Sequence, residues 1–420
     1  MGRALLIAIL LLSNLALYGQ EKSKLGIKLS GFIKNDFFYD SRQTVAAREG
    51  HFLLWPSPER LDEYGNDINA KSNFNFLAIQ SRIKVAISGP DAFGAKISGV
   101  IEGDFFAQLN ANINLFRLRH AYVKLNWTKL EVLTGQYWNP LFVTDCYPGT
   151  ISFNTGTPFQ SFARNPQIRV TYNISGFKII AAALAQRDYA TWGIGGPSSR
   201  YLRNSAVPDM HLQLHYGSKN DNSGLKYVLG GGIAFKSIVP RLESEIGLAN
   251  DIYKINEKVN GLTAMGFTKI TTRPVTIKFQ ARYGENISDI LAISGFAIKE
   301  ITNTATGERS YTALKSMSIW AEIHTNGKIQ FGVFGGYLKN QGTKDPMSHA
   351  DNKVYGLGTD INSLFRISPR VAINSGKVRV ALELEYTVAA YGSDFNLNYI
   401  PANTTKIANL RTLLALCYFF

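Results

Sequence analysis

The chain has 420 residues, of which 45% are hydrophobic and 18% are charged, and its formal net charge at pH 7 is +14. A chain of this length can bury a large core or divide into domains. Its 37 glycines, 25 phenylalanines and 20 tyrosines, beside two cysteines, permit a large β protein and exclude a disordered chain or a disulfide scaffold.

Residues 1–19 have the organisation of a secretory signal peptide. Arg3 supplies a short positive region, residues 4–12 form an apolar core, and cleavage is expected after Gly19. An N-terminal membrane anchor is the alternative, but the apolar stretch is too short to span a bilayer comfortably. We therefore expect an exported protein in which residues 20–420 form a single domain.

Apolar and polar residues alternate through the rest of the chain, as where Leu77, Ile79 and Ile83 alternate with Arg82 and Lys84. A period of two indicates β-strands with one apolar and one polar face. Several of these runs exceed ten residues and are long enough to cross a bilayer, because a tilted transmembrane strand needs about 9–11 residues. The pattern predicts that the apolar face meets lipid, and on this face we place Leu77, Ile79, Ile277 and Val380.

The connections between about sixteen strands alternate between short and long. This asymmetry is typical of an up-and-down outer-membrane barrel and is not expected of a secreted β-sandwich. Short links are expected at 88–94, 126–129, 174–176, 217–225, 271–274, 325–328 and 374–377. Long links are expected at 41–71, 138–166, 188–209, 239–257, 285–310, 340–352 and 392–404. The link at 109–113 is the exception, because it is short at a position where the alternation calls for a long link.

These patterns predict an all-β fold, a transmembrane antiparallel up-and-down β-barrel of about 16 strands in the outer membrane of a Gram-negative bacterium. A closed barrel pairs every backbone group, as hydrocarbon requires, and sixteen strands leave an aqueous channel. Outer-membrane lipid and lipopolysaccharide are the expected surroundings. Aromatic girdles at the two interfaces are expected to contain Tyr39, Tyr122, Tyr283, Tyr386 and Phe105.

The last strand places Leu414, Leu416, Tyr418 and Phe420 on one face, and the chain ends at this aromatic residue. An amphipathic strand closed by phenylalanine resembles the signal that the outer-membrane assembly machinery recognises. We therefore expect this machinery to bind the chain through Phe420.

Charged residues out of phase with the apolar face are expected to line the interior of the barrel, the lumen. Arg3 is the only charged residue of the signal segment, so the remaining chain carries +13. A basic lumen attracts small anions and rejects cations. The alternative is that these charges pair across strands and stiffen the wall. The inward basic residues are Lys34, Arg82, Lys84, Arg117, Arg119, Arg169, Lys278, Arg282 and Arg379, and the inward acids are Asp36, Glu102, Asp104, Glu383 and Glu385.

The long segment 138–166 is rich in apolar residues, including Phe142, Phe153 and Phe162. An apolar loop is unfavourable in water, so we expect it to fold into the barrel as a constriction loop. Packing on a neighbouring subunit is the alternative. If Arg164 moves inward with this loop, its guanidinium is expected to converge with the inward arginines of the wall at the narrowest section.

Two stretches carry a family resemblance: Phe116-Arg117-Leu118-Arg119-His120-Ala121-Tyr122, and Leu133-Thr134-Gly135-Gln136-Tyr137-Trp138-Asn139-Pro140-Leu141-Phe142. Together with the opening Gly31-Phe32-Ile33-Lys34-Asn35-Asp36, they resemble the DcaP-like porins. The resemblance implies a sixteen-stranded homotrimeric porin that passes small, often anionic, solutes. Those porins can carry a helical N-terminal extension, whereas here the first strand begins almost at the predicted mature N-terminus.

Catalytic alternatives rest on few residues. His120 is in phase with Leu118 and Tyr122, which places it outward, and an outer-membrane phospholipase carries its catalytic groups on the outer face. No serine occupies the matching phase of that strand, so we expect no enzyme. A substrate-specific transporter of less polar solutes is another alternative. No cofactor, metal site or nucleic-acid partner is indicated, and Cys146 and Cys417 lack metal-type spacing.

Overall fold

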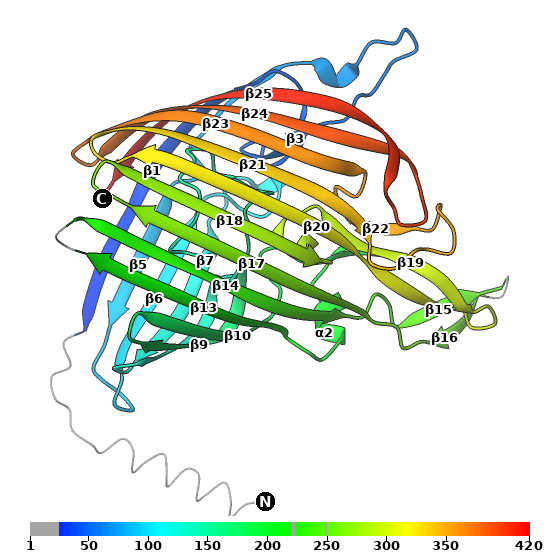
Figure 1. The fold of residues 1–420 in the computed structure, drawn as a ribbon, viewed down its shortest axis with the longest axis horizontal. Helices are drawn as coiled ribbons and strands as arrows, with labels where there is room; N and C mark the ends of the chain where they lie inside the picture. The colour runs from blue at the N-terminus through cyan, green and yellow to red at the C-terminus, as the bar shows by residue number, and fades with distance from the viewer. Residues whose placement is uncertain (1–24, 221–222, 248–249) are drawn as a thin grey trace, which may run out of the picture.

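The structure is a computed structural model that describes residues 25–220, 223–247 and 250–420. The predicted signal peptide 1–19 lies outside the described residues and stays a prediction. The chain forms a closed antiparallel β-barrel (Figure 1), because the first strand pairs with the last as well as with the second. Its sixteen strands agree with the number expected. They are β1 (Gly26–Asp40), β4 with β5 (Asn73–Leu77, Arg82–Ser88), β6 (Lys96–Asp104), β7 (Arg117–Asn126), β8 (Leu130–Trp138), β9 (Arg164–Ile174), β10 (Phe177–Leu184), β13 (Asp209–Asn220), β14 (Leu225–Ile238), β17 (Val259–Thr271), β18 (Val275–Glu285), β20 (Glu308–Thr325), β21 (Ile329–Thr343), β23 (Ile361–Ser375), β24 (Val378–Phe395) and β25 (Pro401–Phe419).

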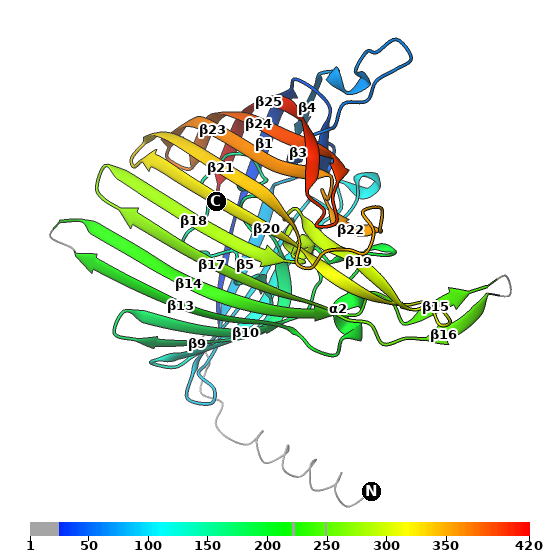
Figure 2. The same cartoon turned by 45° about the vertical axis from the view of Figure 1, so that its right-hand side comes forward.

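The short and long connections are sorted to opposite ends of the barrel, as the sequence predicted. The short links lie at the left of Figure 1, near the C-terminus, and the long loops lie at the right. Figure 2 shows the hairpin of β15 (Glu243–Ile246) and β16 (Asp251–Lys254) projecting beyond the barrel wall. The elements within the long loops are β2 (Thr44–Ala47), β3 (Phe52–Pro56), η1 (Ile68–Ala70), η2 (Asn110–Asn112), β11 (Trp192–Gly193), β12 (Gly196–Pro197), α2 (Arg200–Asn204), β15 (Glu243–Ile246), β16 (Asp251–Lys254), η3 (Ser288–Ile290), β19 (Ser294–Asn303) and β22 (Val354–Leu357).

The outer face of the barrel is apolar, and the two later strands follow the predicted phase. Ile277 and Val380 are exposed on it, as are the predicted girdle residues Tyr39, Tyr283 and Tyr386. A closed sheet with such a face is suited to lipid, because its backbone groups are paired and its apolar side chains meet hydrocarbon.

The prediction that Leu77 and Ile79 face lipid is wrong. Asp36 of β1 pairs with Leu77 of β4, and Phe32 of β1 pairs with Arg82 of β5. The two residues of β1 are four positions apart, whereas their partners Leu77 and Arg82 are five positions apart. The strand formed by β4 and β5 therefore contains one extra residue between Leu77 and Arg82. A β-bulge of this kind reverses which residues point outward. Ile79 is consequently buried in the lumen at 4% exposure, and Leu77 is half-buried.

The predictions that His120 points outward and that Tyr122 belongs to an aromatic girdle are also wrong, because β7 contains a second β-bulge. Glu102 of β6 pairs with His120, whereas the next residue, Gly103, pairs with Leu118, so Arg119 is the extra residue of β7. His120 is buried, and both His120 and Tyr122 line a cavity inside the barrel. The phospholipase alternative thereby loses the outward histidine on which it rested.

A charge on the outer face should destabilise the barrel. Ile319 lies on this face midway along β20, opposite Ala281 and Tyr337. We expect Ile319→Lys to lower the free energy of unfolding by about 2–4 kcal/mol, as for cations at a bilayer midplane. Urea unfolding in lipid vesicles measures the change. Ile252→Lys, in the projecting β16, is the matched control and should change little. Equal losses in both variants would contradict the assignment of the outer face.

Candidate functional site

Residues 139–163, between β8 and β9, fold into the barrel, and we call them the inner loop. Their backbone is held by the far wall: the N–H of Ile151 donates to Glu383 at 2.6 Å, and the carbonyl of Thr157 accepts from Arg366 at 2.7 Å. Trp320 Nε1 donates to Gln160 Oε1 at 2.8 Å. These contacts confirm the inward folding and exclude the alternative of an exposed loop packed on a neighbouring subunit.

Two further loops join the inner loop in one apolar cluster. Phe52 of β3 lies 5.3 Å from the ring of Phe162, and the N–H of Phe162 donates to the carbonyl of Ile290 in η3 at 3.1 Å. Buried wall residues such as Trp320 and Leu338 belong to the same cluster. Part of the lumen is therefore packed, and the open channel expected from strand number alone is narrowed by three loops rather than one.

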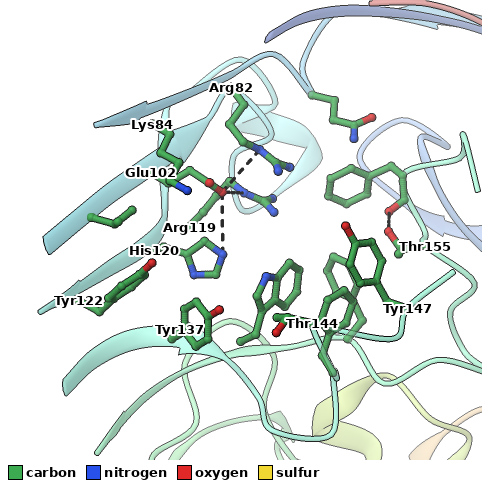
Figure 3. A pocket seen from close by; sticks show the side chains of 16 residues that line it. Arg82, Lys84, Glu102, Arg119, His120, Tyr122, Tyr137, Thr144, Tyr147 and Thr155 are labelled. Atoms are coloured by element: carbon green, nitrogen blue, oxygen red, sulfur yellow. Dashed lines mark hydrogen bonds and ion pairs between the residues drawn. The ribbon is translucent and has the colours of Figure 1, made fainter. Parts of the chain in front are cut away.

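Between the inner loop and the wall of β5–β8 lies a cavity of about 330 Å³, which we call the inner cavity (Figure 3). Arg82, Lys84 and Glu102 approach it from β5 and β6, and Figure 3 shows His120, Tyr122 and Tyr137 on the adjoining strands. A second cavity of about 260 Å³ shares Tyr137, Phe142 and Thr144 with it and is also lined by Lys124, Arg169, Lys178 and His215. The two cavities thus follow the same side of the barrel, along β5–β10 and the adjacent β13.

A larger cavity of about 570 Å³, the vestibule, is lined by residues of the long loops, including Arg48, Phe52, Asp188 and Tyr189. Phe52 contacts Phe153 and Phe162, which line the inner cavity, with ring centroids 5.3 Å apart in each pair. These aromatic contacts lie between the vestibule and the inner cavity, and we call this part of the lumen the narrow section.

The charged residues predicted to line the lumen do lie on the inner side of the wall, but several are paired. Arg117 Nε contacts Asp104 at 2.8 Å, and Arg119 contacts Glu102 at 2.8 Å and Asp104 at 2.7 Å. Arg82 lies 3.6 Å from Glu102. For these arginines the geometry matches the alternative of cross-strand pairing, because the two acids of β6 offset their charge.

Arg164 does turn toward Arg117 at the narrow section, but Asp188, which the sequence did not single out, neutralises it. Arg164 Nη2 lies 2.6 Å from Asp188 Oδ2, and Arg117 Nη1 lies 3.9 Å from Asp188 Oδ1. Asp188 belongs to the loop between β10 and β13, outside any alternating run. Sequence alone offered no signal for this pairing, because it depends on how two loops meet.

Other predicted cations have no acidic partner within 4 Å in the described part of the chain. They are Lys84, Arg169, Arg282 and Arg379. Arg169 donates to Gln167 Oε1 at 2.9 Å and to the carbonyl of Trp138 at 2.6 Å. Arg282 is buried against the inner loop, where it donates to Ser161 and to the carbonyl of Pro158. Lys34, in contrast, pairs with Asp36 at 3.1 Å.

Within the described residues, no group of three or more His, Cys, Asp or Glu is arranged to hold a metal ion. Cys146 and Cys417 are free and buried, and burial raises the pKa of the Cys146 thiol in the inner loop to about 11. In the same part of the chain, no helix is long and apolar enough to span a membrane.

Neither a protein-family model nor a curated protein matches the chain. Among solved structures it is similar to the outer-membrane channel DcaP of Acinetobacter baumannii, with a TM-score of 0.67 and 15% identity over 94% of this chain and 97% of that chain. It is also similar to OmpT of Vibrio cholerae (TM-score 0.53, 11% identity, 94% and 98% covered) and to an anion-selective porin from Comamonas acidovorans (0.51, 11%, 94% and 100%).

The fold is therefore that of the sixteen-stranded porins of the Gram-negative outer membrane. The porin resemblance noted on residues 116–122 and 133–142 is confirmed at the level of the fold. These two stretches lie largely on β7 and β8, and several of their side chains line the inner cavity.

Proposed function

We propose that the chain forms an outer-membrane channel for passive diffusion of small hydrophilic solutes, with a preference for anions. The observation that carries the preference is the pair of cations Lys84 and Arg169, each lining a cavity beside the inner loop without an acidic partner within 4 Å in the described residues. In a confined, low-dielectric passage such charges raise the local concentration of anions. The porin fold supports the channel itself, and the anion-selective Comamonas porin shows that this fold is compatible with the preference.

The assembly and surroundings follow from the same proposal. Outer-membrane lipid and lipopolysaccharide would meet the apolar outer face, and the assembly machinery would bind Phe420. A homotrimer is supported by a fold match to a trimer form of OmpT of Vibrio cholerae. Solution mass measurement in detergent tests this oligomeric state.

A substrate-specific channel for less polar solutes is the second candidate. It is favoured by the aromatic residues at the inner cavity, among them Tyr122, Tyr137, Trp138, Phe142 and Tyr147. Liposome swelling with neutral and anionic solutes of equal size separates the candidates. Faster entry of the anion supports our proposal, and faster entry of the neutral solute supports the second candidate.

Reversal potentials in a potassium chloride gradient test the anion preference. We expect the wild type to favour chloride, and Lys84→Gln combined with Arg169→Gln to lower the chloride-to-potassium permeability ratio about threefold, because two lumenal charges are lost. The matched control is Lys96→Gln with Lys226→Gln, which removes two exposed cations near the short turns and should leave the ratio unchanged. A cation-selective wild type would refute the preference.

A further inference from the structure

A groove of about 330 Å³ lies on the outer face of the barrel, at the loop end of β9, β10 and β13, and we call it the outer groove. On the wall, Ala183 of β10 lies between Ile168 of β9 and Met210 of β13, whose larger side chains are exposed. The small side chain of Ala183 therefore leaves a hollow between two bulky neighbours. The second side of the groove is formed by Arg203 in α2 and by Val207, and Figures 1 and 2 show α2 at the loop end of the barrel.

The lining of the outer groove is apolar. Apart from Arg203, the described residues that line it have hydrocarbon side chains, among them Pro166, Ala183, Ala185, Leu202 and Val207. Such side chains offer water no hydrogen-bond partner, and an empty hollow forfeits the dispersion contacts of its lining. The volume of the groove falls in the range of about 300–1,000 Å³ that ligand pockets have. A hydrocarbon chain therefore fills the groove better than water does.

The outer groove lies at the level where the acyl chains of the outer leaflet meet their headgroups. The eight residues of β10 extend about 26 Å from the short turn at 174–177 to the groove, at about 3.3 Å per residue. The apolar band of an outer-membrane barrel is about 25 Å tall, and its strands are tilted, so the groove lies just inside the edge of this band. Long loops of such barrels face the outside of the cell. The lipid at this end is therefore lipopolysaccharide, whose lipid A part carries several acyl chains on a phosphorylated sugar headgroup.

Two arginines beside the outer groove match the phosphate of such a headgroup. Arg200 and Arg203 are exposed and lie three residues apart on α2, so they are neighbours on the helix surface. Neither has an acidic partner within 4 Å in the part of the chain that the structure describes. The N–H of Val239 donates to the carbonyl of Tyr201 at 2.9 Å, which holds α2 against the wall. Guanidinium binds phosphate oxygens in a two-pronged fashion, so an apolar groove with these cations at its rim matches an anionic lipid.

We propose that the outer groove binds one acyl chain of lipid A while Arg200 and Arg203 bind its phosphate. The site lies on the lipid side of the wall, so it does not depend on which solutes pass through the lumen. Ser198 and Ser199, which directly precede α2, line the vestibule. A lipid that holds α2 in place therefore also steadies the rim of the vestibule.

Titration of the folded protein in detergent with purified lipid A, followed by native mass spectrometry, tests the site. We expect Arg203→Gln to raise the lipid A concentration at half-saturation about tenfold, because a hydrogen bond between charged groups is lost. Ala183→Trp and Val207→Trp fill the groove from its two sides, and each should raise this concentration at least about tenfold, because the acyl chain loses its apolar contacts. Heat-modifiable migration verifies that each barrel is folded.

Two variants are matched controls. Ala264→Trp also places an indole between two bulky exposed side chains of the outer face, Ile233 and Tyr283, but outside the outer groove. Arg60→Gln removes an exposed arginine from another long loop. Both should stay within about twofold of the wild type, as surface substitutions away from a site do. Unchanged half-saturation in the three groove variants, or equally tight binding of phosphatidylglycerol to the wild type, would overturn the proposal. Loss of the native oligomer in both groove-filling variants would also overturn it, because the groove would then be a contact between copies of the chain.

Discussion

Replacing Phe420 with serine is expected to leave the chain unfolded in the periplasm instead of as a barrel in the outer membrane. The N–H of Gly31 donates to the carbonyl of Phe420 at 3.2 Å, and the N–H of Phe420 donates back at 3.1 Å. These bonds are the last pair of the β1–β25 seam that closes the barrel. Serine keeps both backbone bonds, so the expected loss comes from the missing aromatic side chain, which is the expected recognition signal of the assembly machinery.

The measurement is the amount of heat-modifiable protein in the outer-membrane fraction. Leu410→Ser is the matched control, because Leu410 is exposed on the same face of β25 but lies midway along the strand. This control should assemble at nearly the wild-type yield. A normal yield of folded Phe420→Ser protein would show that neither the seam nor the assembly step depends on the terminal side chain.

Arg366→Ala should release two of the loops that fill the lumen and raise the single-channel conductance severalfold. The Arg366 guanidinium is 1% exposed and donates to the carbonyls of Thr157 in the inner loop, at 2.7 Å, and Leu54 in β3, at 2.6 Å. It also lies 3.1 Å from Glu385, which is equally buried. Removing one partner of a buried pair costs about 3–5 kcal/mol, because the other charge is left without compensation.

We expect the two loops to move while the barrel stays folded, because the sixteen paired strands do not require Arg366. Conductance in planar bilayers and thermal melting of the detergent-solubilised protein measure the two effects. Lys124→Ala is the control: Lys124 pairs with Glu131 at 3.1 Å on the inner wall, with both side chains about one quarter exposed. Such a pair contributes about 0–1 kcal/mol. An Arg366→Ala channel with wild-type conductance would contradict the anchoring role.

Strand number, the sorting of loops and most of the outer face could be read from the sequence. Ile277 and Val380 were placed correctly because lipid imposes one simple rule on a barrel, namely that apolar side chains alternate outward. The inward folding of residues 138–166 also followed from the sequence, since a loop with this many aromatic residues is unfavourable in water.

The same alternation failed at Ile79 and His120, because a bulge adds one residue to a strand and reverses its phase. A bulge is defined by the register against the partner strand, which a run of residues does not contain. The pairing of charges across the lumen was equally hidden. Arg366 meets Leu54, and Arg164 meets Asp188, only after the barrel closes and the long loops pack together inside it. Sequence periodicity therefore determined the wall of the barrel, whereas tertiary packing alone decided which lumenal cations are neutralised and which remain available to a solute.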